Sequence, residues 1–99
     1  MSSTILVIDD DPMMATTAES LFKQWGYAVL TAQSGEAGLS LLEEQDADLV
    51  ISDIRMPGMS GEEVLKRIKE DHPDLPVILL TGHGKLVIRD LSELSRLAA

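Results

Sequence analysis

Four short apolar segments are spaced along the chain, and they alternate with segments of helical periodicity. Continuous runs of three or four apolar residues occupy positions 5–8, 49–51 and 77–80. Runs of this length without polar alternation are typical of strands that are covered on both faces. A milder run over 27–32 follows Gly26 and predicts a strand nearer the edge of the sheet.

Helical segments lie between these runs and begin at recognisable capping residues. Asp11, which precedes a proline, predicts a helix start, and Gly26 predicts the end of that helix. Ser34 predicts the start of a second helix, and Ser60 with Glu63 forms a capping box for a third. The residues expected on the inner faces are Met14, Ala18, Leu21, Phe22 and Trp25 in the first helix, Ala37, Gly38, Leu41 and Leu42 in the second, and Val64, Leu65 and Ile68 in the third.

The resulting order is a strand and a helix repeated three times, closed by a fourth strand. Such alternation predicts an α/β fold with a doubly wound parallel sheet and helices on both faces. Ligands of such sheets bind outside the carboxyl ends of the strands, so the polar residues that follow the apolar runs are the candidates for chemistry. They are Asp9, Asp10 and Asp11 after the first run, Ser52 and Asp53 after the third, and Thr81 and Gly82 after the fourth.

The chain is acidic and contains no cysteine. Its 99 residues include 17 acidic and 8 basic side chains, which give a formal net charge of −9. This charge repels phosphate backbones and anionic membrane surfaces, so we expect no direct binding of nucleic acid or membrane. The absence of cysteine excludes disulfides, thiolate metal sites and thiol catalysis. No segment has the pattern of a signal peptide or a membrane span, and we expect a cytoplasmic protein.

The acidic residues suggest a metal site. If the first and third strands are neighbours, the carboxylates of Asp9, Asp10 and Asp53 converge at one edge of the sheet. Like charges at such short range repel unless they are protonated or share a cation. A set of oxygen ligands without histidine or cysteine suits Mg²⁺ or Mn²⁺, with water molecules completing the octahedron. Asp11 is better explained as a helix cap than as a metal ligand, because it precedes a proline.

Three motifs, taken in order, resemble the receiver domain of two-component response regulators, especially the type fused to sigma-54-dependent transcriptional activators. The motifs are VIDDDP at 7–12, ISDIRMPGMSG at 51–61 and LLTGHG at 79–84. The resemblance covers residues 4 to about 84 and implies a flavodoxin-like sheet with strand order 2-1-3-4. We therefore assign residues 1–84 to a receiver core and residues 85–99 to an atypical C-terminal tail.

The resemblance also implies a role for each matched residue. Asp53 corresponds to the phosphoacceptor, and Asp9 with Asp10 corresponds to the acidic pair that binds Mg²⁺. The backbone carbonyl of Arg55 is expected to be a further metal ligand. Thr81 corresponds to the hydroxyl residue that hydrogen-bonds the phosphoryl group and shifts on activation. The implied donor is a sensor histidine kinase, and the implied output is regulation of transcription by a phosphoacceptor that is not itself an enzyme.

The C-terminal end departs from the family pattern. A complete receiver continues with a helix, a fifth strand that ends in a lysine and a last helix, whereas only residues 85–99 follow here. Lys85 does not stand at the matching position, so the role of that lysine is not transferred to it. Residues 85–88 fit either an antiparallel edge strand or part of a longer helix. The segment from Asp90 onward predicts a short helix, with an apolar stripe formed by Leu91, Leu94, Leu97 and Ala98.

Two functions of different classes remain open at this point. The first is a phosphoacceptor module that a kinase switches. The second is a shortened receiver-like domain that no longer switches and serves as an interaction module, because an exposed sheet edge and apolar face near the C-terminus favour a homodimer. A metal-dependent hydrolase of the phosphoaspartate kind is disfavoured, since Arg55 stands where such enzymes need a second acid.

Overall fold

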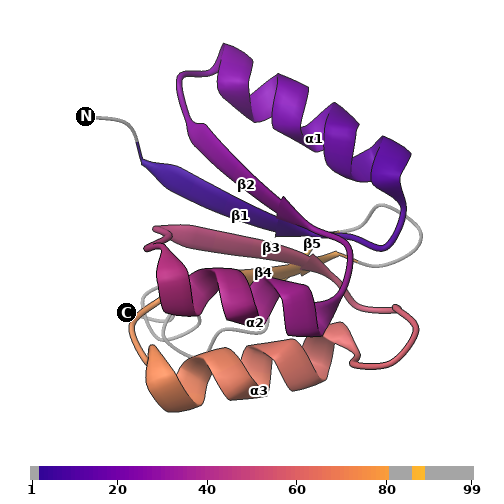
Figure 1. Ribbon diagram of the computed structural model, residues 1–99, viewed down its shortest axis with the longest axis vertical. Coiled ribbons are helices and arrows are strands. Elements are labelled where there is room, and N and C mark those ends of the chain that lie inside the picture. The colour runs from indigo at the N-terminus through magenta and orange to yellow at the C-terminus, as the bar shows by residue number, and fades with distance from the viewer. Residues whose placement is uncertain (1–2, 81–85, 89–99) are drawn as a thin grey trace.

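The computed structural model describes residues 3–80 and the backbone of residues 86–88. It contains the expected alternation of strands and helices, followed by one additional strand (Figure 1). The elements are β1 (Thr4–Ile8), α1 (Pro12–Gln24), β2 (Ala28–Ala32), α2 (Gly35–Glu44), β3 (Leu49–Asp53), α3 (Gly61–Asp71), β4 (Val77–Leu80) and β5 (Leu86–Ile88).

The strands form one sheet in the order β2-β1-β3-β4-β5. The first four strands are parallel, and β5 runs antiparallel to β4. The order 2-1-3-4 expected for the parallel strands is confirmed, and β2 lies at the edge of the sheet as predicted. Residues 86–88 adopt the antiparallel edge strand, so the alternative of a continuous helix through them is wrong. The connection over 81–85, which includes Thr81, lies outside the described residues, as does the predicted final helix.

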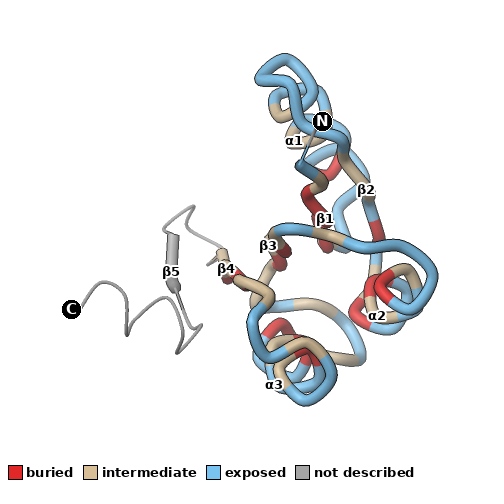
Figure 2. The backbone as a smooth tube through the Cα atoms, turned by 90° about the vertical axis from the view of Figure 1, so that its left-hand side faces the viewer, coloured by how far each residue is buried: buried red, intermediate tan, exposed pale blue. Residues whose placement is uncertain are grey.

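Helices cover the sheet on both faces. In Figures 1 and 2, α1 lies on one face, and α2 and α3 lie side by side on the other. The predicted cap residues accept hydrogen bonds from backbone N–H groups in the first turns: Asp11 from Met13 at 3.0 Å, Ser34 from Ala37 at 3.1 Å and Ser60 from Glu63 at 3.2 Å. None of these three helices is both long enough and apolar enough to cross a bilayer.

The hydrophobic core lies between the sheet and the pair of helices α2 and α3. Its buried side chains are Leu6, Ile8, Ala32, Leu42, Val50, Val64, Ile68, Val77 and Leu79. Because side chains alternate along a strand, the members from β1, β3 and β4 occupy every second position and share one face of the sheet. Gly38 allows α2 to approach closely, since a Cβ atom there would lie 2.4 Å from Cδ1 of Ile8.

The apolar stripe of α1 is not buried in the way its periodicity predicts. Met14, Leu21 and Trp25 are 55%, 42% and 64% exposed, and Ala15 is the buried residue of this helix. In α2, Ala37 is likewise exposed and does not point inward. Periodicity identifies an apolar side of a helix but does not identify what covers it. Among the described elements, α1 packs mainly on β1 and β2.

Candidate functional site

The adjacent positions of β1 and β3 bring three aspartates together at the carboxyl end of the sheet. Asp53 is the last residue of β3, and Asp9 and Asp10 directly follow β1. The register pairs Ile8 with Ser52, so the chain continues into Asp9 and Asp53 at the same level. One carboxylate oxygen from each of the three aspartates lies within 4.8 Å of the others. The structure therefore brings together the acidic cluster expected from the sequence.

Backbone hydrogen bonds hold Asp9 in this position. Its N–H donates to the carbonyl of Ala32 at 3.0 Å, which extends the pairing of β1 with β2 by one residue. Its Oδ1 accepts from the N–H of Asp11 at 2.9 Å, which orients the carboxylate. The carboxylate of Asp11 itself accepts from Met13 and caps α1. The predicted capping role of Asp11 is confirmed.

The backbone of Asp53 is fixed by its neighbours in sequence and in space. Ser52 is fully buried, and its Oγ donates to the carbonyl oxygen of Asp53 at 3.0 Å. The N–H of Ile54 donates to the carbonyl of Leu80 at 3.0 Å, which carries the pairing of β3 with β4 past Asp53. These hydrogen bonds fix the backbone at the end of β3, from which the Asp53 side chain projects.

Sequence reasoning overlooked Gly61. A Cβ atom at this position would lie 2.3 Å from the carbonyl oxygen of Asp53, and the N–H of Gly61 donates to the carbonyl of Ile54 at 2.8 Å. The first turn of α3 thus rests directly on the strand end that carries Asp53. A signal was present, because glycine has poor helix propensity and is kept within a helix where packing requires it.

The electrostatic environment disfavours the charged form of Asp53. Partial burial raises the pKa of its carboxyl group above the usual value, and the negative charge of Asp9, with a smaller effect from Asp10, raises the pKa further. The backbone N–H groups of Ile54 and Arg55 act in the opposite direction by hydrogen-bonding the carboxylate. A bound cation would reduce the repulsion between the carboxylate of Asp53 and those of Asp9 and Asp10.

The donor set fits a hard divalent cation. Mg²⁺ binds oxygen at about 2.1 Å in an octahedron, which separates its ligand oxygens by about 3 to 4 Å. The carboxylate oxygens of Asp9, Asp10 and Asp53 lie close to this range. Asp10 is exposed and the other two are partly exposed, so water can complete the coordination. The carbonyl of Arg55 as a further ligand stays a prediction, and Thr81 lies outside the described residues.

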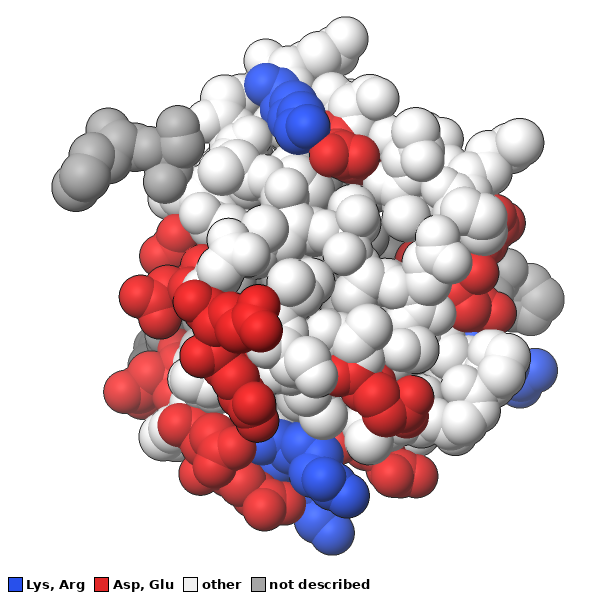
Figure 3. Space-filling view, in the orientation of Figure 1, with Lys and Arg blue, Asp and Glu red and all other residues white. Residues whose placement is uncertain are grey.

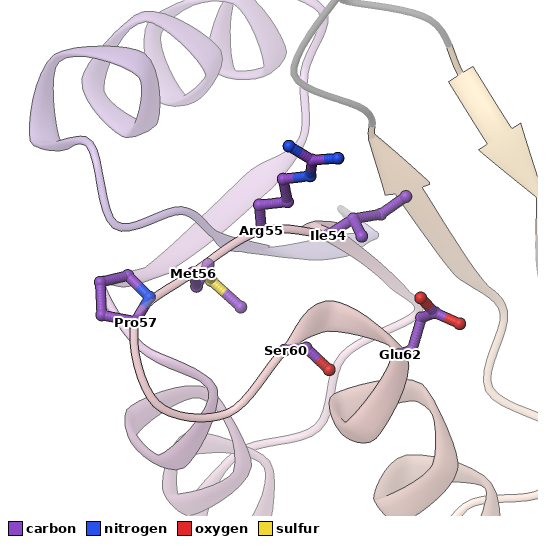
Figure 4. Close-up of a pocket in the computed structure, with 6 residues that line it drawn as sticks. All are labelled: Ile54, Arg55, Met56, Pro57, Ser60 and Glu62. Carbon is purple, nitrogen blue, oxygen red and sulfur yellow. The ribbon is translucent and has the colours of Figure 1, made fainter.

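A pocket of about 550 Å³ opens beside the loop that follows β3. Figure 4 shows its lining residues, with Ile54, Arg55, Met56 and Pro57 on the loop and Ser60 and Glu62 at the start of α3. Arg55 and Pro57 extend in different directions from the loop. The loop after Asp53 therefore borders an open pocket.

Comparison with known proteins places the chain in a family. The profile of the response regulator receiver domain matches residues 5–93. The chain belongs to the response regulator receiver domain family. Its alternating fold, its 2-1-3-4 parallel order and its acidic cluster are therefore those of a receiver domain.

The curated relatives support the type of receiver inferred from the motifs. The chain is 42% identical over 82 residues to the transcriptional regulatory protein GlrR of Escherichia coli K12, a match that covers 83% of this chain and 18% of GlrR. It is 41% identical over 80 residues to the DNA-binding transcriptional regulator NtrC of Klebsiella pneumoniae, covering 81% of this chain and 17% of NtrC. The receivers of these sigma-54 activators form their N-terminal part. The chain spans less than a fifth of either relative.

Solved structures of the response regulator TrrA from Thermotoga maritima have the same fold. One, a complex with Mg²⁺ and a beryllium fluoride, is 38% identical, with a TM-score of 0.78 over 98% of this chain and 81% of TrrA. Another holds TrrA in complex with the histidine kinase ThkA, with the same identity and TM-score over 84% of this chain and 72% of TrrA. A receiver similar to this chain thus binds Mg²⁺ and a histidine kinase.

Proposed function

We propose that this receiver takes a phosphoryl group onto Asp53 from a phosphohistidine of a sensor histidine kinase, in the presence of Mg²⁺. The observation that carries the proposal is the convergence of the Asp9, Asp10 and Asp53 carboxylates within 4.8 Å at the carboxyl end of the sheet. The Mg²⁺ and kinase complexes of TrrA support the choice of cofactor and donor. Mn²⁺ has the same ligand preferences and is the expected substitute.

The proposed reaction transfers a phosphoryl group from a histidine nitrogen to a carboxylate oxygen of Asp53. An Oδ atom of Asp53 attacks phosphorus, and the new O–P bond forms as the P–N bond to the donor histidine breaks. The leaving nitrogen keeps the electron pair of that bond and takes a proton from solvent. Water later attacks the acyl phosphate, which releases inorganic phosphate and restores the carboxylate. This chain contributes position and electrostatics to the transfer, because Asp53 is its only side chain whose covalent bonds change.

The remaining site residues would bind the cation and stabilise the negative charge of the phosphoryl group. Asp9, Asp10 and Asp53 would hold the cation, together with the carbonyl of Arg55. When bound, Mg²⁺ neutralises the repulsion between the phosphoryl oxygens and the surrounding carboxylates. The hydroxyl of Thr81 would donate to a phosphoryl oxygen, which couples the new charge to the loop after β4.

Mass spectrometry of the intact chain tests this function. Incubation with a small acyl phosphate and Mg²⁺ is expected to add the mass of one phosphoryl group. Asp53→Asn is expected to abolish the adduct. Asp46→Asn, which changes the charge equally at an exposed position, is expected to keep it. An unmodified wild-type chain, or an adduct that survives in Asp53→Asn, would contradict the proposal.

The relatives support a proposal for the output of the module. GlrR and NtrC are named as transcriptional regulators, and the chain matches less than a fifth of each. We extend the proposal to control of transcription through an output domain in the same cytoplasmic compartment as the kinase. Phosphorylation of Asp53 would act on that domain through a charge-induced rearrangement of neighbouring loops.

The edge strand favours a second candidate function, an interaction module. Among the described strands, β5 pairs only with β4 and ends the sheet. An unpaired strand edge is a template for pairing with another chain, so a homodimer through the C-terminal region is the corresponding proposal. Light scattering distinguishes the two candidates. A dimer that ignores Mg²⁺ and phosphoryl analogues favours the interaction module, and a monomer at micromolar concentration contradicts it.

A further inference from the structure

The loop between β3 and α3, residues 54–60, is held against the rest of the domain by two methionines. Pro57 and Gly58 are exposed at its tip, whereas Met56 and Met59 are partly buried and pack against the hydrophobic core. The side chains that anchor the loop therefore lie on both sides of its exposed tip.

Met59 lies against the start of α2. Gly58 has a φ of +79°, a conformation that glycine adopts without the strain a side chain would cause, and this turn leads the chain to Met59. A Cβ atom on Gly35, the first residue of α2, would lie 3.1 Å from both Cβ and Sδ of Met59. The same Cβ atom would lie 2.6 Å from Cγ2 of Val64 in α3. A side chain at position 35 would therefore displace the loop or the helix.

We call Gly35, Met59 and Val64 the α2 junction. Gly35 and Val64 are buried, and the φ of Gly35 is not positive, so close packing is the reason for a glycine here. In Figure 1, α2 and α3 begin at the edge of the sheet where the loop leaves β3. The α2 junction thus lies at the same edge of the sheet as the acidic cluster.

The first half of the loop reaches the acidic cluster. The backbone N–H groups of Ile54 and Arg55 hydrogen-bond the carboxylate of Asp53. The loop is closed at its base, because the N–H of Gly61 donates to the carbonyl of Ile54 at 2.8 Å. Three residues separate Arg55 from Met59. In a loop this short, a displacement of Met59 is transmitted to the backbone of Arg55.

We propose that Met59, packed against Gly35, is a positioning residue for the metal site. It holds the backbone groups of Ile54 and Arg55 in place toward Asp53 and the cation, and it touches neither the cation nor the phosphoryl group. This inference rests on the proposed function, in which the carbonyl of Arg55 is a metal ligand. Replacement of a residue that orients metal ligands typically weakens metal binding by about 10–100-fold.

Calorimetric titration with Mg²⁺ tests this role, because it measures binding and not phosphoryl transfer. Met59→Ala is expected to raise the Kd for Mg²⁺ by about tenfold. Met59→Leu keeps an apolar side chain of similar volume and is expected to restore a Kd close to the wild-type value. Met59→Val, a smaller truncation, is expected to raise the Kd by less and takes the place of Met59→Ala if that variant does not fold. An unchanged Kd in the folded truncation variant would overturn the proposal.

Leu75→Ala separates positioning from a general loss of stability. Leu75 is also partly buried against the hydrophobic core, but it lies just before the amino end of β4, away from the acidic cluster. Its truncation is expected to lower the unfolding temperature, as Met59→Ala does, and to leave the Kd unchanged. An equal rise of the Kd in both variants would contradict the role of Met59.

The wild-type chain distinguishes failure of this inference from failure of the proposed function. A wild-type chain that binds no Mg²⁺ would contradict both. Normal binding by the wild-type chain, with no effect of the Met59 truncation, would contradict the role of Met59 alone.

Hydrogen exchange without metal provides a second measurement of the loop. The backbone amide of Gly61, which closes the loop on Ile54, is expected to exchange faster in Met59→Ala than in Leu75→Ala. Each variant is measured at the same interval below its own unfolding temperature, which removes the effect of global stability. Equal exchange of this amide in the two variants would mean that Met59 does not hold the loop, and would overturn the proposal.

Discussion

Asp53 carries its charge in surroundings that favour the protonated form. Burial and the charges of Asp9 and Asp10 raise its pKa in the folded chain above the usual value of 3.8. A raised folded pKa means that the native state binds the proton more tightly than the unfolded state does. The stability that Asp53 contributes is complete below pH 3.8 and is lost as the pH rises through the folded pKa.

Substitution of this residue tests the charge argument. In the absence of metal, Asp53→Asn is expected to unfold at a higher temperature than the wild-type chain at neutral pH, because the variant no longer ionises next to Asp9. The difference in unfolding temperature between the variant and the wild-type chain is expected to decrease as the pH falls toward 3.8. Thermal unfolding with a chelator over a range of pH measures both effects. Asp46→Asn serves as the control for net charge, and an equal stabilisation by both variants would contradict the argument.

Asp53 also shows what could be predicted at the residue scale. The sequence places an aspartate after an apolar run, and the capping role of Asp11 follows from the proline beside it. The convergence of Asp9 with Asp53 requires β1 and β3 to be neighbours. Residues far apart in the chain make that pairing, and apolar runs alone do not specify it. Here the family resemblance supplied the strand order.

At the scale of elements, the contact between the first turn of α3 and the end of β3 links the fold to the site. Gly61 lets the first turn of α3 rest on the carbonyl of Asp53. The backbone N–H of Gly61 fixes the same contact by donating to Ile54. The helix therefore fixes the position of the strand end from which the Asp53 side chain projects.

Gly61→Ala tests this contact between α3 and β3. The added methyl group would lie against backbone that has no room to move, so we expect a loss of about 1–3 kcal/mol in the free energy of unfolding. Phosphoryl uptake is expected to slow, because the Asp53 backbone must shift. Chemical denaturation and the rate of adduct formation measure the two effects. Lys66→Ala, at an exposed position in the middle of α3, is expected to change neither. A fully stable Gly61→Ala would mean that the contact is unimportant.

The elements also show where local sequence reasoning stops. The strand over 49–51 extends to Asp53, because backbone pairing with β4 continues past the apolar run. The stripe of α1 predicted a buried side, yet Met14, Leu21 and Trp25 are exposed. Helix caps depend on residues a few positions apart and could be predicted. Burial depends on contacts with residues that are distant in sequence, which the local pattern does not identify.

At the scale of the whole molecule, negative charge dominates. Acidic side chains outnumber basic ones over the face shown in Figure 3, in line with the net charge of −9. Mutual repulsion at this charge destabilises the compact state, and Asp9, Asp10 and Asp53 bring three of these acidic groups together at one point. Binding of Mg²⁺ at this point therefore links the metal to the stability of the whole domain.

Mg²⁺ is expected to stabilise the chain by mass action. At a concentration of one hundred times the Kd, the gain is about 2.7 kcal/mol, because the unfolded chain has no assembled site. Asp10→Asn is expected to lose this gain. Asp11→Asn, an adjacent substitution with the same change in charge, is expected to keep it, since asparagine also caps α1. Thermal unfolding with and without Mg²⁺ compares the two variants, and an equal response would contradict the assignment of the metal ligands.

The central claim is that Asp53 accepts the phosphoryl group with the help of a cation held by Asp9 and Asp10. Fragment mass analysis of the chain, after treatment with an acyl phosphate, tests it most directly. The expected result is an adduct on Asp53 that forms with Mg²⁺, fails to form with a chelator and is lost in Asp10→Asn. An adduct on any other residue, or one that forms on Asp53 equally well without metal, would contradict it.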